Sequence, residues 1–99
     1  MIYTTKGKLV FIGELTYPTR TLTKRIFHLL DVTPPNQQRL PFELLNEQCR
    51  WMDAFETGDQ IKVQFIIRAV DWKDKQGNNK LILALAPVGI TRIDSDNTF

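Results

Sequence analysis

The residues of this sequence best suited to chemistry are Trp72 and the basic side chains around it. An aromatic ring can stack on a nucleic-acid base, at about 1–3 kcal/mol per base, while lysine and arginine bind phosphate groups. Gly77 and Asn78 tolerate the positive φ of a tight turn. The basic residues nearby are Arg68, Lys73, Lys75 and Lys80. This composition is typical of an arm laid along a nucleic-acid backbone, and a solvated hairpin loop is the alternative.

Residues 58–88 form the elements that would carry these side chains. Apolar and polar residues alternate before Trp72, which predicts a strand with one face in a core. The pattern stops in the charged segment 73–80, and an apolar run resumes at 81–85 before Pro87 ends it. We therefore predict a hairpin with a charged tip. Its core-facing residues are Ile61, Val63, Phe65, Ile67 and Ala69, and its outward residues include Lys62, Gln64 and Arg68.

Three shorter strands and one helix are predicted before this hairpin. The strands are expected at residues 8–12, 24–31 and 40–45. A threonine-rich loop at 16–23, broken by a proline, would join the first two. Asn46 is suited to cap a short helix, and Gly58 is suited to end it.

Length and composition limit the protein class. The chain has 99 residues, of which 42% are hydrophobic, so it is expected to form one domain with a modest core. Its single cysteine, Cys49, cannot form an internal disulfide, which favours a reducing compartment. No apolar run reaches the roughly 20 residues of a membrane span, and the N-terminus lacks an apolar signal core. We therefore expect a cytoplasmic protein without membrane association.

The net charge of +2 is small, but the charges are unevenly distributed. Residues 1–39 contain six basic and two acidic side chains, whereas residues 40–60 contain one basic and five acidic ones. A fold that separates these segments would have a basic face and an acidic back, as polyanion-binding proteins do.

The order of the elements predicts an all-β OB-fold over residues 1–93. This fold is a five-stranded Greek-key barrel, here with one short helix between its third and fourth strands. OB-folds bind oligonucleotides across the second and third strands and the 1–2 and 4–5 loops. The candidate nucleic-acid-binding residues are Tyr17, Arg20, Lys24, Arg25, Lys62, Arg68, Trp72, Lys73, Lys75 and Lys80.

Three segments carry a resemblance to a known family. Lys8–Leu15 is similar to its opening strand, Phe42–Asn46 to its third strand and helix start, and Trp72–Gly77 to its 4–5 hairpin. The chain thus resembles the bacterial single-stranded DNA-binding protein family and small OB-fold relatives such as primosomal replication protein N. The resemblance implies binding of single-stranded DNA without strong sequence preference, in DNA replication, recombination or repair. Family members end in an acidic tip with a terminal phenylalanine that partners capture. The resemblance therefore implies that Phe99, in the short acidic tail 94–99, binds replication or repair proteins, and a frayed polar tail is the alternative.

No residues have the types and spacing of a catalytic or metal site. Only Asp31 is an acidic residue close to His28 in the sequence, and no motif surrounds Cys49. We therefore predict no enzyme, no cofactor and no metal. Trp51 and Phe55 fit packing of the helix on the barrel. The phenylalanines assigned to the core by their parity are Phe11, Phe27, Phe42 and Phe65.

Two alternatives remain open at this point: an OB-fold that binds RNA, and an OB-fold used as a protein-interaction or structural module.

The side chains predicted to face outward from the last two strands are more apolar than a solvated surface usually is, which predicts a homodimer. The residues concerned are Ile66, Val70, Ile82, Ala84 and Ala86.

Overall fold

The computed structural model describes residues 1–31 and 37–93, apart from the side chain of Trp72. The elements in these ranges are β1 (Tyr3–Ile12), β2 (Thr16–Thr19), β3 (Leu22–Asp31), β4 (Gln38–Leu45), the 3₁₀ helix η1 (Asn46–Ala54), β5 (Gln60–Lys73) and β6 (Asn79–Arg92). Within this part of the chain, no helix has the length and apolar character needed to span a bilayer.

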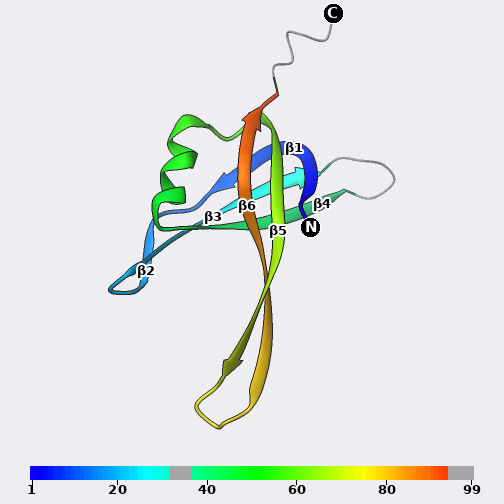
Figure 1. The fold of residues 1–99 in the computed structure, drawn as a ribbon. Helices are drawn as coiled ribbons and strands as arrows, with labels where there is room; N and C mark the ends of the chain where they lie inside the picture. Colours follow the sequence, from blue (N-terminus) through cyan, green and yellow to red (C-terminus); the bar gives the residue numbers. More distant parts are fainter. Residues whose placement is uncertain (32–36, 94–99) are drawn as a thin grey trace, which may run out of the picture.

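Five of the strands close into a barrel, and β2 forms a short antiparallel hairpin with the start of β3 (Figure 1). Antiparallel pairs join β1 to β3 and β5, β3 to β4, and β5 to β6. A parallel contact between Phe42 and Leu85 closes the ring between β4 and β6. The order around the barrel is therefore β1, β3, β4, β6, β5, with η1 between the third and fourth barrel strands. The predicted OB-fold is confirmed.

Every second side chain of each barrel strand points into the barrel, and these side chains form the core. Its fully buried apolar residues from the strands are Leu9, Phe27, Leu29, Phe42, Leu44, Ile61 and Val63. Phe27 and Phe42 are directly opposed on β3 and β4, with ring centroids 5.1 Å apart. Met52 of η1 is buried in the same cluster, and Trp51 and Phe55 pack against it, which confirms the predicted packing of the helix.

The local predictions around η1 and β2 were partly wrong. Asn46 is the first residue of η1 and has a φ of 55°, and its side chain makes no cap hydrogen bond. Instead, Asn46 Oδ1 accepts a hydrogen bond from the Thr23 amide at 3.1 Å, so the side chain links η1 to β3. Residues 16–19 of the expected loop form β2, because they pair with β3 as far as the contact between Thr19 and Leu22.

Beyond the barrel, β5 and β6 continue as a two-stranded ribbon (Figure 1). The predicted core positions Ile67 and Ala69 are exposed, because the alternation of β5 continues past the end of the core. Ala86, predicted to face outward, is only 7% exposed. The predicted end of the last strand near Pro87 was also wrong: β6 runs on to Arg92, and Pro87 lies beside a shift in the register with β5.

Candidate nucleic-acid interface

The outer surface of β3 and β4 is the place where an OB-fold is expected to bind an oligonucleotide. Lys24, Ile26 and His28 of β3 alternate with the buried core residues. Ile26 is paired with Glu43 of β4, and His28 is paired with Pro41. This surface therefore combines a cation, a carboxylate, an imidazole and apolar area.

Phe11 lies on this surface and not in the core. The register between β1 and β3 shifts between Leu9 and Phe11, so Leu9 pairs with Leu29 whereas Phe11 pairs with His28. Such a bulge reverses the parity of the residues that follow it. The Phe11 side chain is 41% exposed, and its ring centroid lies 4.9 Å from that of His28. The assignment of Phe11 to the core was wrong for this reason.

Arg39 completes this group of side chains. Its Nε donates a hydrogen bond to His28 Nδ1 at 2.9 Å, so a neutral His28 carries its proton on Nε2. Burial of the imidazole, and secondarily the charge of Arg39, lowers the pKa of His28 from its ordinary value of 6.5. We call Phe11, His28 and Arg39 the ring platform. None of the three was among the predicted site residues, because the bulge that brings Phe11 beside His28 leaves no mark in the sequence.

Glu43 lies between two of the predicted phosphate-binding cations. Its Oε2 is 3.6 Å from Lys24 Nζ, and its Oε1 is 3.2 Å from Arg68 Nη2. These contacts bring together β3 of the barrel and β5 of the ribbon. In the free protein, one carboxylate therefore partly neutralises both cations.

Tyr17 and Arg20 are placed by β2. Tyr17 lies on this strand and is 69% exposed, and Arg20 is exposed in the turn that leads to β3. Thr16 pairs with Lys24, which puts the start of β2 next to the barrel surface that carries Lys24.

Arg25 lies in a different environment from the other predicted cations. Its Nε donates to the Gly13 carbonyl at 2.9 Å, and its Nη1 donates to the Cys49 carbonyl and to Asp53 Oδ1, each at 3.2 Å. Its side chain is only 19% exposed. These contacts join β3 to the end of β1 and to η1, so Arg25 stabilises the packing of the helix.

The remaining cations lie along β5 and the ribbon. Lys73 and Lys75 are exposed, and Lys80 Nζ lies 3.9 Å from Asp74 Oδ2. Lys62, by contrast, is at the opposite end of β5 from Lys73 and is paired with Lys6 of β1. The ribbon residues are thus brought together, and Lys62 lies apart from them. The side chain of Trp72 and the whole of Phe99 lie outside the described part of the protein.

A turn closed by hydrogen bonds to Asp74 forms the tip of the ribbon. Asp74 Oδ1 accepts hydrogen bonds from the amides of Gln76 and Asn78, both at 2.9 Å, and Gly77 has a φ of 85°. The amide hydrogen bond from Asn78 is the largest cause of a lowered pKa of Asp74. The lysines on either side of the turn are therefore held on an ordered loop.

Comparison with solved structures finds the same fold. A structure of the mitochondrial single-stranded DNA-binding protein Rim1 of S. cerevisiae is 15% identical, covers 94% of each chain and has a TM-score of 0.63. The dimeric N-terminal domain of PriB from Thermoanaerobacter tencongensis is 18% identical, covers 95% of this chain and 97% of that one, and has a TM-score of 0.65. The predicted resemblance is confirmed at the level of the fold. The sequence itself matches no protein-family model and no curated protein.

Proposed function

We propose that this protein binds single-stranded DNA without strong sequence preference. In this proposal it acts in DNA replication, recombination or repair in the cytoplasm, as a binding protein and not as an enzyme. The observation that carries the proposal is the ring platform on the outer surface of the barrel. The exposed Phe11 ring and the imidazole of His28 offer faces to bases, and Arg39 and Lys24 lie on the same barrel surface for phosphates. Unpaired bases expose their faces, whereas bases in a duplex do not.

The ribbon extends this surface away from the barrel. A DNA strand that crosses the ring platform can continue past Arg68 towards Lys73, Lys75 and Lys80. Tyr17 and Arg20 offer contacts on the β2 side. Arg25 can bind a phosphate only by giving up contacts with η1, and Lys62 is reached only if the DNA continues round the barrel towards β1.

Titration of fluorescent oligo-dT, oligo-U and duplex DNA at two salt concentrations tests the proposal. We expect oligo-dT to bind more tightly than duplex DNA, with an affinity that falls as salt rises. Equal affinity for the duplex, or no binding at low salt, would contradict single-strand binding. Clearly tighter binding of oligo-U than of oligo-dT would indicate that the ligand is RNA and not DNA.

We propose in addition that the protein is a homodimer that pairs through the ribbon. Two-stranded ribbons are marginally stable alone. Directly paired residues of antiparallel strands share a face of the ribbon. By this rule, the face of β5 and β6 that points to the core inside the barrel continues along the ribbon with Ile67, Leu83 and Leu81, which contact solvent. They are 49%, 65% and 64% exposed. A second copy presents the same three apolar side chains, and the dimeric state of the similar PriB domain supports this arrangement.

This interface differs from the one expected from the sequence. The opposite face of the ribbon, which carries Val70 and Ile82, also carries Arg68 and Lys80. Leu83 also borders a hollow lined by Ile26 and Glu43, so pairing would cover the ribbon side of this hollow, whereas Arg68 and Lys80 lie on the opposite face of the ribbon. Pairing would join two binding surfaces, which raises avidity for a long DNA strand.

Light scattering of two matched variants tests the interface. Leu83→Lys is expected to be monomeric at concentrations at which the wild type is dimeric, because it places a charge in the proposed interface. Val70→Lys, on the opposite face, is expected to remain dimeric. A monomeric wild type, or a dimeric Leu83→Lys variant, would contradict the proposal.

A further inference from the structure

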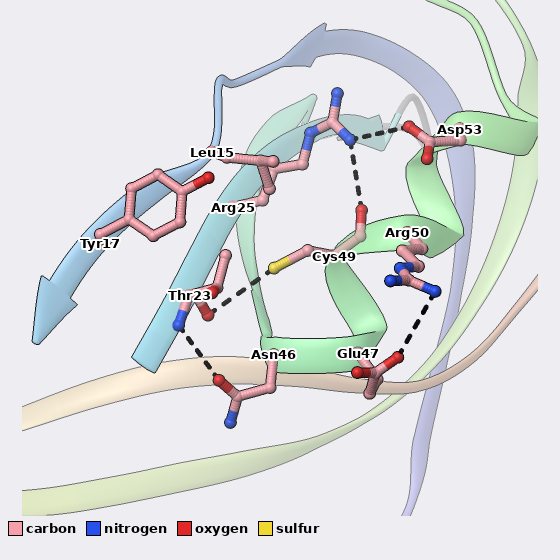
Figure 2. A pocket seen from close by; sticks show the side chains of 9 residues that line it. All are labelled: Leu15, Tyr17, Thr23, Arg25, Asn46, Glu47, Cys49, Arg50 and Asp53. Carbon is pink, nitrogen blue, oxygen red and sulfur yellow. Dashed lines mark hydrogen bonds and ion pairs between the residues drawn. The ribbon is translucent and has the colours of Figure 1, made fainter. Parts of the chain in front are cut away.

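A hollow of about 330 Å³ lies between η1 and the segment that joins β1 to β2 (Figure 2). Leu15 and Tyr17 line one side of it, and Asn46 and Glu47 of η1 line the other. Pockets that hold small molecules have volumes of about 300–1,000 Å³, so this one is large enough for a single small ring system. Tyr17 is 69% exposed, so its ring is accessible to such a ligand.

The polar groups at the back of the hollow already make hydrogen bonds within the protein. Arg25 donates to two backbone carbonyls and to Asp53. The Cys49 thiol contacts the Leu44 carbonyl at 3.4 Å, and burial, the largest cause, raises the pKa of Cys49. Any polar recognition of a ligand must therefore come from the residues nearer the opening.

Asn46 and Glu47 supply one donor and one acceptor there. Because Asn46 Oδ1 accepts from the Thr23 amide, the side-chain orientation is fixed and Nδ2 is left as a donor. Among the described residues, Nδ2 has no acceptor. Glu47 is 3.9 Å from Arg50 Nη1, but the two side chains are 88% and 80% exposed, and such pairs contribute little. The Glu47 carboxylate can therefore take a ligand as its partner.

We propose that this hollow binds one unstacked guanine base of a bound DNA strand, an inference that rests on the proposed function. The Watson–Crick edge of guanine has an acceptor, O6, beside two donors, N1–H and N2–H. Glu47 would accept from both donors, Asn46 Nδ2 would donate to O6, and the Tyr17 ring would stack on the base. Thymine has carbonyl oxygens on both sides of its only donor, so one of them would face the carboxylate. The protein thus tolerates most sequences but prefers guanine at one position.

Fluorescence anisotropy with a matched set of oligonucleotides tests the pocket. An oligo-dT carrying one central guanine should bind wild-type protein about fivefold to tenfold more tightly than oligo-dT of the same length, since a bidentate pair discriminates between bases by at least this much. Single adenine and cytosine substitutions should give smaller gains. Glu47→Gln should abolish the guanine advantage, measured as the affinity for the guanine-containing oligonucleotide divided by the affinity of the same variant for oligo-dT.

Two further variants separate recognition from general effects of charge or folding. Glu56→Gln makes the same charge change just beyond η1 at a residue that does not line the hollow, and it should keep the guanine advantage. Asn46→Asp keeps an oxygen for the Thr23 amide, and aspartate tolerates the positive φ of this position. It replaces the donor to O6 by an acceptor and should lose the advantage.

The outcomes distinguish this inference from the proposed function. If oligo-dT does not bind, single-strand binding itself fails. If oligo-dT binds but guanine confers no advantage, or if both Glu47→Gln and Asn46→Asp retain it, only the guanine pocket is overturned. Free dGMP is expected to bind much more weakly than the guanine-containing oligonucleotide. If dGMP saturates the protein at the same concentration as the guanine-containing oligonucleotide, the ligand of the hollow is a free nucleotide and not a base of a bound DNA strand.

Discussion

Replacing Glu43 by glutamine should strengthen binding of single-stranded DNA. The Glu43 carboxylate contacts Lys24 at 3.6 Å and Arg68 at 3.2 Å, on the surface proposed to meet phosphates. A phosphate bound to either cation would lie close to this negative charge. The substitution removes the repulsion, keeps the shape of the side chain and leaves both cations for the DNA.

The expected gain can be estimated from the geometry. A phosphate bound to Lys24 would lie about 6 Å from the carboxylate, and with an effective dielectric constant of about 60 their repulsion is about 1 kcal/mol. This corresponds to roughly a fivefold gain in affinity. Each phosphate contact contributes about 0.7 to the salt slope for a single strand, so freeing both cations should steepen the slope by about 1 to 1.5. Each of these two partly exposed ion pairs contributes about 0–1 kcal/mol, so the loss of folding stability should be small.

Anisotropy titrations of oligo-dT at several salt concentrations measure both quantities. Glu56→Gln is the matched control, since it makes the same change in net charge outside the proposed interface. The reasoning is refuted if Glu43→Gln binds more weakly than wild type with an unchanged salt slope. In that case the carboxylate would be orienting Lys24 and Arg68 for the DNA and not competing with it.

Three other predictions concern the ring platform and the barrel. Phe11→Ala should weaken binding of oligo-dT by about 1–3 kcal/mol with a minor loss of stability, measured by titration and by urea unfolding. Because the pKa of His28 is lowered in the fold, the unfolded chain binds more protons below about pH 6.5, and the free energy of unfolding should fall as pH drops through this range. Urea unfolding of wild type and His28→Gln at pH 5–7.5 measures this, and the variant should lack that part of the pH dependence. Gly7→Ala should destabilise the fold by about 2–3 kcal/mol, because the added Cβ would clash with the Leu30 carbonyl oxygen. The Cβ added by Gly89→Ala would meet only the flexible Gln64 side chain at 3.3 Å, so this substitution should cost much less stability.

The barrel could be predicted from the sequence because its signals are periodic. Alternation along residues 24–31 and from Ile61 to Val63 places the buried side chains correctly, and the order of strands and helix is that of the OB-fold. The end of the core was not predictable in the same way. Ile67 continues the alternation but lies at the edge of the barrel, where it is 49% exposed. Periodicity reports which side chains share a face and not what that face meets.

The candidate site was less predictable, because its residues depend on irregular features. The bulge after Leu9 moves Phe11 to the outer surface, and only then do its ring and that of His28 meet. Asn46 was assigned to a helix cap on residue type, but a partner on β3 determines its orientation. Arg25 looks like a surface cation in the sequence, yet carbonyls from two distant segments hold it. Each of these outcomes depends on contacts between elements, which residue types and spacing do not contain.

The placement of charge explains how a chain with a net charge of only +2 can suit a polyanion. The acidic residues between 47 and 59 lie on η1 and on its connection to β5, whereas three lysines lie around the tip of the ribbon, which projects from the barrel (Figure 1). In the proposed binding mode, nucleic acid would therefore be attracted to the ribbon before the barrel, although the molecule as a whole is nearly neutral. Glu43 lies where the ribbon meets the barrel and holds a cation from each. In the proposed binding mode, a DNA strand that reaches the ring platform from the ribbon would have to separate this carboxylate from Lys24 and Arg68. The expected affinity is then the phosphate attraction less the free energy of breaking these two ion pairs.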